Sequence, residues 1–332
     1  MNPPVCPFDV AIVGDCCLDL VLYGLPDILP PERELQAESM AMRIGGSATI
    51  SAHNLSCLGN AVGFVFASAD DSFGQFCRTR LNAAKVDTTR AVDRRGGATG
   101  VTVILQHAHL RHMFTHAGVI ASLTLEDIDL DYVCRARHFH MASYYLQRGL
   151  TPDIPELLRR IKGRGLTISM DPNDDPDNTW DRTALDALQY VDVFMPNENE
   201  ACRITGEDNL ENAIRFLVQR VPLLVIKRGA QGASAFKSAD SWHVPAYPVR
   251  VVDAIGAGDS FDAGFLHGYL RDWTVERCLE FGNLTGAWST TASGGTDAFF
   301  ERESQEKLWQ AWSLRGTGSS LRKKHGSRSG IH

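Results

Sequence analysis

The sequence contains no long apolar run and no basic leader. No segment reaches the roughly 18 apolar residues that a membrane-spanning helix requires. Residues 1–7 lack the basic start and apolar core of a secretory signal. We therefore expect a cytoplasmic protein that has no membrane partner.

Paired cysteines and an excess of positive charge are absent as well. The eight cysteines are dispersed, and none forms the C-x-x-C pair of a zinc ribbon or a thioredoxin-type site. We interpret them as reduced, mostly buried thiols. The 332-residue chain has a formal net charge of −7, whereas binding to nucleic acid depends on clustered Lys and Arg. No nucleic-acid partner is expected, and substrates are expected in a local site.

Short apolar runs alternate with helical patterns along most of the chain. Strands are predicted at residues 8–14, 61–66, 99–106, 138–141, 166–170, 191–195, 223–226 and 234–236. Helices are predicted at residues 47–58, 72–84, 152–162, 209–219 and 257–270. This alternation indicates βαβ units, so we expect an α/β fold with a three-layer, doubly wound, mostly parallel sheet. No linker or repeat of fixed period divides the chain, and one domain is expected over residues 8–312.

Two segments, at about residues 20–43 and 96–115, do not fit the alternation. The pattern from Asp19 to Tyr23 leads into a Pro-rich stretch, which predicts an edge strand followed by a loop. We interpret the two segments as paired β excursions that form a small lid over a site at the edge of the sheet. Residues 315–332 are basic and rich in Gly and Ser, and they are predicted to be disordered because they can bury little apolar area.

The most informative segment covers residues 253–265 and reads D-A-I-G-A-G-D-S-F-D-A-G-F. A turn of Gly256, Ala257 and Gly258 that leads into a helix leaves backbone N–H groups unpaired, and the helix dipole there favours an anion such as phosphate. Asp259 in the first turn either caps the helix or takes a proton from a hydroxyl beside the turn. A short glycine motif alone does not decide between these roles.

The whole segment is similar to the C-terminal signature of the ribokinase-like (PfkB) carbohydrate kinases, D-T-x-G-A-G-D-x-F-x-A-G-F. Four other segments resemble family motifs in the family's order: the N-terminal signature at residues 45–59, D-P-N at 171–173, P-N-x-x-E at 196–200 and K-x-G-x-x-G at 227–232. On these five matches the chain is identified as a member of this family. The resemblance implies a ribokinase-like fold and ATP-dependent phosphoryl transfer to a hydroxyl of a sugar or related small molecule.

The resemblance also implies catalytic and metal-binding roles. Asp259 would be the general base, and the amides of residues 256–258 would be the anion hole for the transferred phosphoryl group. Asn197 and Glu200 match the positions that hold a hydrated Mg²⁺. Their alternative role is to cap a helix expected after Thr205.

Nucleotide and substrate contacts follow in the same way. The resemblance places four residues on the nucleotide side: Lys227, Gly229, Gly232 and Asn283. A cation and close backbone approach suit phosphates and ribose there, although Lys227 could equally be solvated. Substrate contacts are expected from Asp19, Gly45 and Gly46, because paired glycines let the backbone approach a sugar and a carboxylate accepts two hydroxyl donors. Asp19 could otherwise be a turn residue at the end of a strand.

The chain departs from the family pattern at three places. Ile50 replaces the usual Asn, so one common hydrogen bond to the sugar is missing. Ala254 and Ile255 replace the hydroxyl residues of D-T-T, which leaves open a monovalent-cation site beside the ATP loop. Asp174 and Asp175 follow D-P-N where members acting on sugar acids often carry an Arg, which argues against an acidic sugar.

Four histidines, at 107, 109, 112 and 116, form one other cluster. The i, i+4 spacing of His112 and His116 suits a helical zinc pair, but no Glu lies between them and no third ligand has the right spacing. We therefore favour a polar strand of the lid over a metal site.

Three functional alternatives remain at this point. A nucleoside kinase of the same family is one. A non-catalytic sensor of a sugar or nucleotide is another, motivated by Ile50 and the altered 254–255 pair. A Rossmann dehydrogenase fits less well, because the Gly motif lacks the third glycine and lies near the C-terminus. Expected partners are a sugar or nucleoside, with a homodimer through the lid as family members often form.

Overall fold

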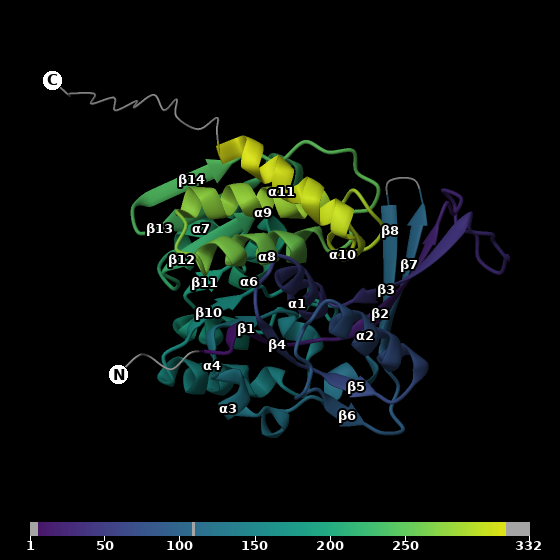
Figure 1. The fold of residues 1–332 in the computed structure, drawn as a ribbon, viewed down its shortest axis with the longest axis horizontal. Helices are drawn as coiled ribbons and strands as arrows, with labels where there is room; N and C mark the ends of the chain where they lie inside the picture. Colours follow the sequence, from purple (N-terminus) through teal and green to yellow (C-terminus); the bar gives the residue numbers. More distant parts are fainter. Residues whose placement is uncertain (1–5, 108–109, 317–332) are drawn as a thin grey trace.

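The computed structural model describes residues 6–107 and 110–316. Its core is an eight-stranded sheet in the order β14-β13-β12-β11-β10-β9-β1-β4 (Figure 1). The strands are β1 (Phe8–Val13), β4 (Val62–Val65), β9 (Ala136–Met141), β10 (Thr167–Met170), β11 (Val193–Phe194), β12 (Leu223–Lys227), β13 (Ala233–Lys237) and β14 (Asp240–Val244). The strands from β12 to β4 are parallel, and β13 and β14 are antiparallel at one edge. The predicted α/β fold with a mostly parallel sheet is confirmed.

Helices cover both faces of this sheet. One face packs on α3 (Leu130–Val133), α4 (Ile154–Gly163), α5 (Thr183–Ala187), α6 (Glu198–Thr205) and α7 (Leu210–Leu217). The other packs on α1 (Ser47–Cys57), α2 (Ser72–Ala83), α8 (Ala257–Tyr269), α9 (Val275–Ser289), α10 (Asp297–Phe300) and α11 (Arg302–Gly316). Strand β1 shows why: Ala11 and Val13 face the first layer while Val10 and Ile12 face the second, as the two-residue period of a strand requires.

The two segments outside the strand–helix alternation contribute to one four-stranded sheet in the order β3-β2-β7-β8. Its strands are β2 (Cys17–Tyr23), β3 (Ser39–Gly45), β7 (Gly100–His107) and β8 (Leu110–His116), and they project from one side of the body (Figure 1). Strand β2 pairs with β3 and with β7, so the expected edge position of residues 19–23 is wrong. The prolines lie in the loop after β2 and therefore cost the sheet no hydrogen bond.

One face of the four-stranded sheet rests on the body of the protein. Val21 and Ile104 pack on Ile255, which belongs to the D-A-I-G-A-G-D segment. Tyr23 donates a 2.9 Å hydrogen bond to Asp253 of the same segment and also contacts Ser293. A smaller sheet pairs β5 (Ala67–Ala69) with β6 (Val92–Arg94).

Other expectations concern the histidines, the membrane and the C-terminus. His107 and His112 stack with ring centroids 5.0 Å apart, and no group of three metal-ligating side chains occurs among the described residues; His109 lies outside them. None of the described helices is long and apolar enough to cross a membrane. Helix α11 includes the first two residues of the tail predicted at 315–332, and residues 317–332 lie outside the described part.

Candidate active site

The polar motif residues follow the carboxyl ends of neighbouring parallel strands. Asp15 lies just after β1, Asp171 directly after β10 and Asn197 just after β11, while Lys227 is the last residue of β12. Because parallel strands end at a common edge, these side chains meet there, as ligand sites of open α/β sheets do. The N-terminus of α8 reaches the same edge and brings Asp259.

The pair Gly45–Gly46 makes room for two carboxylates. A Cβ on Gly45 would lie 1.9 Å from Asp19 Oδ1, and one on Gly46 would lie 2.7 Å from Asp15 Oδ2. Gly46 also has φ +92°, a conformation that side chains other than glycine rarely adopt. The glycines therefore allow Asp15 and Asp19 to sit against the turn that begins α1, where substrate contacts are expected. Asp15 was not predicted from the sequence, although its place directly after the strand and Gly14 was a usable signal.

Asp259 lies in the first turn of α8 and is 7% exposed. Burial and the nearby Asp171 raise the pKa of Asp259 to about 7, while Lys227 and the Ser47 hydroxyl oppose the rise. Gly256, with φ +68°, turns the chain into the helix. The amide of Ala257 makes one long 3.4 Å contact with Ala254 O, and the amides of Gly256 and Gly258 have no hydrogen-bond acceptor among the described residues. These donors are thus available to an anion.

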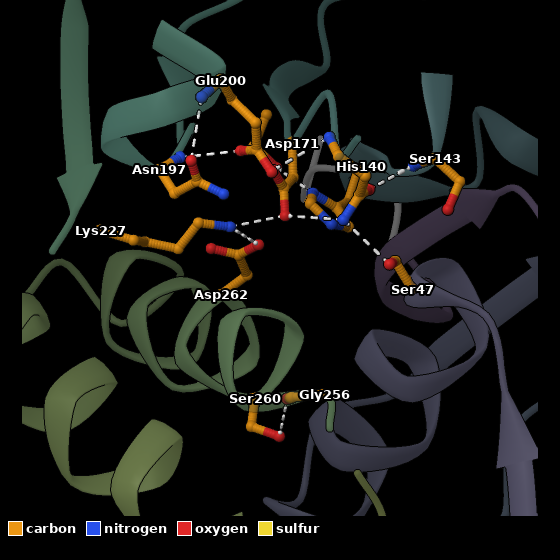
Figure 2. Close-up of polar contacts among 12 residues, drawn as sticks. Ser47, His140, Ser143, Asp171, Asn197, Glu200, Lys227, Gly256, Ser260 and Asp262 are labelled. Atoms are coloured by element: carbon orange, nitrogen blue, oxygen red, sulfur yellow. Dashed lines mark hydrogen bonds and ion pairs between the residues drawn. The ribbon is translucent and has the colours of Figure 1, made fainter. Parts of the chain in front are cut away.

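Lys227 is neither solvated nor free. Its Nζ lies 2.6 Å from Asp171 Oδ2 and 3.1 Å from Asp262 Oδ2 (Figure 2). The two carboxylates raise the pKa of Lys227, and Lys227 lowers the pKa of Asp171. Burial and the charge of Asp171 raise the pKa of Asp262 well above its usual range, while Lys227 opposes the rise. A Cβ on Gly258 would be 3.5 Å from Lys227 Nζ, so this ammonium lies beside the turn of residues 256–258.

Asn197 and Glu200 form the N-terminal capping box of α6. Asn197 N donates to Glu200 Oε2 at 2.8 Å, and Glu200 N donates to Asn197 Oδ1 at 2.9 Å (Figure 2). The helix that this pair caps begins at Glu198. The expected position of that helix, after Thr205, is therefore wrong. Burial and Asp171 raise the pKa of Glu200 to about 7. Its carboxyl group therefore belongs to the same buried cluster as Asp171, Lys227 and Asp259.

The expected nucleotide-side residues Gly232 and Asn283 meet at the end of β14. Gly232 has φ +92°, and a Cβ there would lie 2.0 Å from Val244 O. Asn283 Nδ2 donates to the carbonyls of Val244 and Pro245 at 2.9 and 3.2 Å. Both residues therefore fix the chain that leaves β14. Gly229 has φ +53° and open space at its Cβ position.

Asn173, the last residue of D-P-N, connects three segments of the site. It has φ +57°, its Nδ2 donates to Ser47 Oγ at 2.9 Å, and its Oδ1 accepts from Ser143 N at 2.6 Å. Figure 2 shows Ser47 and Ser143 on the side of the site opposite Asn197 and Lys227. The motif gave the position of Asn173, but its contacts join residues far apart in the sequence.

A second polar connection, around Asn54, was missed. Asn54 Nδ2 donates to Ser260 Oγ and to Gly295 O, both at 2.9 Å, and Ser260 Oγ donates to Gly256 O at 2.7 Å (Figure 2 shows the last pair). Ile50, one turn earlier on α1, fills the space between the backbones of Gly256 and Gly295. The departure at Ile50 thus has a packing role. A buried Asn within the N-terminal signature was the available signal for this connection.

A ribokinase-like α/β fold whose strand ends meet a Gly-Ala-Gly turn and a buried aspartate defines a phosphotransferase that acts on small molecules. The chain belongs to the pfkB family of carbohydrate kinases, whose model matches residues 8–301. It is therefore an ATP-dependent carbohydrate kinase, and kinases of this family use ATP with Mg²⁺.

Two relatives illustrate the likeness in sequence. The chain is 26% identical to the 5-dehydro-2-deoxygluconokinase of Geobacillus kaustophilus, with 88% of this chain and 90% of the relative covered. It is 31% identical to the ATP-dependent ribose-1-phosphate kinase of Halopiger xanaduensis, with 81% and 88% covered.

Solved structures show the likeness in fold. A putative ribokinase II from E. coli superposes with a TM-score of 0.82 at 23% identity, covering 92% of this chain and 99% of that one. The same protein in complex with ATP and Mg²⁺ gives a TM-score of 0.81.

Proposed function

We propose that Asp259 is the general base that accepts the proton of a sugar hydroxyl as this hydroxyl attacks the γ-phosphoryl group of ATP. The observation that carries the proposal is the burial of Asp259 at the start of α8, beside amides that have no acceptor among the described residues. A pKa of about 7 suits a proton acceptor near neutral pH. The amides of Gly256, Ala257 and Gly258 would then stabilise charge on the transferred group.

The oxygen donors of Asn197 and Glu200 fit Mg²⁺ bound through water. Mg²⁺ prefers oxygen ligands and keeps several waters when it bridges phosphates. A direct cage is not needed for this, which agrees with the lack of a group of three metal-ligating side chains in the described part. When bound, Mg²⁺ neutralises phosphate charge. Lys227 would help to hold the phosphates beside Gly258. For this its ammonium group would exchange part of its contact with Asp171 and Asp262 for contact with the phosphates.

The contacts of Asp253 favour a nucleotide-binding loop, at residues 253–258, that does not need a monovalent cation. Its carboxylate accepts hydrogen bonds from Ile255 N, Gly294 N and Tyr23 Oη, each at 2.9 Å. These three donors satisfy the carboxylate oxygens, so the loop is held in place by the protein's own hydrogen bonds. We expect equal rates in potassium and tetramethylammonium salts, and a rate several-fold higher in potassium would contradict this.

The four-stranded sheet is proposed to act as the lid and as the contact between two copies of the chain. Two apolar cross-strand pairs lie on the face opposite to Val21 and Ile104, namely Leu22 with Met40 and Val103 with Phe114. Met40 and Phe114 are 61% and 60% exposed, and exposed apolar faces of this kind mark interfaces. Changing both to Lys should convert a dimer into a monomer in sedimentation velocity, and an unchanged assembly would contradict this contact.

The alternative of a non-catalytic sensor was based on Ile50 and on the altered pair at 254 and 255. Ile50 packs between two glycine backbones, and Ile255 packs under the four-stranded sheet. Both departures from the family pattern thus have structural explanations. A nucleoside substrate stays open as a proposal, because the adenosine kinase of Sinorhizobium meliloti shares the fold at 22% identity and a TM-score of 0.80. All eight cysteines are free, which supports a reducing, cytoplasmic location.

The decisive experiment compares the native chain with Asp259→Asn. ADP release is measured on a panel of pentoses, hexoses, sugar phosphates, sugar acids and nucleosides. Removal of the base should lower the rate by about 10² to 10⁴ for any substrate that turns over. Equal rates in the two proteins would rule out Asp259 as the base. Binding without turnover in the native chain would support the sensor instead.

A further inference from the structure

Three carboxyl groups line the substrate side of the site. Asp15, Asp19 and Asp259 are 1%, 5% and 7% exposed. Asp15 and Asp19 lie against the Gly45–Gly46 turn, and Asp259 lies at the start of the facing helix. Burial raises the pKa of Asp19, and the negative charges of Asp15 and Asp259 raise it further. A further negative charge on the substrate side is therefore unfavourable, because these carboxyl groups already oppose one another's ionisation.

The cations near this group in the described part of the chain are each already in an ion pair. Lys227 forms its ion pairs with Asp171 and Asp262. Arg43 lies directly opposite Asp19 in the β2–β3 pairing, yet its Nε lies 2.6 Å from Asp297 Oδ2. Arg80 contacts the same Asp297 from α2 at 3.3 Å. Neither Asp15 nor Asp19 forms an ion pair among the described residues.

Asp19 lacks strong donors as well as a cation. The single hydrogen bond to its carboxyl group in the described part comes from the Cys17 thiol, at 3.6 Å. A thiol is a weak donor, and buried carboxyl oxygens normally have stronger partners. Thr102, across β2 and β7 from Asp19, contacts Cys17 and Thr115 and so adds hydroxyl groups to the same face. Asp19 can therefore accept further hydrogen bonds from hydroxyl donors of a ligand.

We propose that the substrate is an uncharged, hydroxyl-rich molecule and that sugar phosphates and sugar acids are poor substrates, because Asp15, Asp19 and Asp259 are gathered at one side of the site and none of them forms an ion pair among the described residues. Hydroxyl groups satisfy the carboxyl oxygens, whereas a phosphate or carboxylate adds like charge in a buried site. Discrimination of this kind comes from repulsion of the wrong ligand as well as attraction of the right one. The inference rests on the kinase function proposed above. It also separates this chain from the two relatives named for anionic substrates, a gluconate derivative and ribose 1-phosphate.

The test uses substrate pairs that differ in one anionic group: ribose with ribose 5-phosphate and ribose 1-phosphate, fructose with fructose 6-phosphate, and glucose with gluconate. We expect kcat/KM, measured by ADP release, to be at least about 10-fold higher for the neutral member of any pair that turns over. Equal values, or a preference for the anionic member, would overturn the inference while leaving the kinase function intact.

Two variants identify the cause of the discrimination. Asp19→Asn removes one negative charge and should reduce the neutral-to-anionic ratio, even where the rate itself falls. Arg43→Gln should leave the ratio unchanged. A loss of anionic turnover in Arg43→Gln would instead reveal Arg43 as an anion site and would overturn the inference.

Binding keeps the two proposals distinguishable. The same pairs are titrated into the full chain by calorimetry, with no nucleotide present. If no pair turns over, the kinase proposal fails, and the inference is judged on affinity alone. Tighter binding of the neutral members supports it, while tighter binding of the anionic members, or no binding of any neutral member, overturns it.

Discussion

Two groups of buried carboxyl groups flank Asp259, and they are held in different ways. Asp171 and Asp262 share Lys227, so their charge is balanced within the protein. Asp15 and Asp19 have no ion pair among the described residues, and burial raises their pKa, that of Asp19 to about 7. The balanced group is complete before any ligand arrives. Asp15 accepts a hydrogen bond from Ala48 N, whereas the Asp19 carboxyl group accepts only from the Cys17 thiol among the described residues, so Asp19 is the member that hydroxyl donors of a ligand would satisfy.

The largest effect should come from breaking the balanced group with Lys227→Met. Asp171 would then be a buried carboxylate with no cation, and loss of one partner of a buried ion pair costs about 3–5 kcal/mol. Urea unfolding at pH 7 measures the loss. Asp262→Asn is the matched control, because burial and Asp171 raise the pKa of Asp262 and the amide keeps the shape of the side chain; we expect it to cost less than about 1 kcal/mol. Equal losses would show that the charge assignment is wrong.

In the unbalanced group, Asp19→Asn should have the opposite effect on stability. The pKa of Asp19 is raised in the folded state, so its contribution to stability is present below about pH 4 and is lost as the pH rises through about 7. Above pH 7 the Asn variant should therefore be more stable than the native chain, by about 2 kcal/mol, although its affinity for substrate falls.

This prediction is checked by unfolding both proteins between pH 4 and pH 8. The difference in the free energy of unfolding should grow with pH and level off just above pH 7. A difference that is independent of pH would mean that Asp19 does not change its ionisation on folding.

A third change leaves both groups intact and alters only the helix start between them. Asn54→Ala removes the hydrogen bonds to Ser260 and Gly295 that position the Gly256 turn. We expect kcat to fall about 10-fold with KM for the sugar nearly unchanged, because a misplaced anion hole affects the transition state more than substrate binding.

The control for Asn54 is Ser51→Ala on the same helix. Ser51 is buried, and its hydroxyl has no hydrogen-bond partner among the described residues. Its removal should leave kcat unchanged. A similar loss of kcat in both variants, or a loss of thermal stability alone in Asn54→Ala, would contradict a positioning role for Asn54.

The sequence predicted most of the central sheet because its strands and the helices between them have distinct periods. The elements it missed lack such a pattern. Helix α9 is buried on most sides and contains Gly282 and Gly286, so no amphipathic stripe marks it. Strand β14 is a short, largely exposed edge. The interior place of β2 was missed because the prolines after Tyr23 suggested an edge.

The motif residues were predictable, but their neighbours were not. Lys227 is 56 residues from Asp171 and 35 from Asp262, and no spacing rule brings them together. Gly45 and Gly46 were expected to admit a sugar, whereas the structure shows that they first admit the side chains of Asp19 and Asp15. A glycine in the sequence indicates that another group comes close to the backbone, but it does not say which group.

The contact of Tyr23 with Asp253 connects the four-stranded sheet directly to the segment that leads into α8. Lifting that sheet breaks this hydrogen bond and exposes Val21, Ile104 and Ile255 to water. A nucleotide bound while the sheet is raised would contact a loop that has lost part of its support. Transfer of its phosphoryl group to water would therefore be slow as long as no sugar is enclosed.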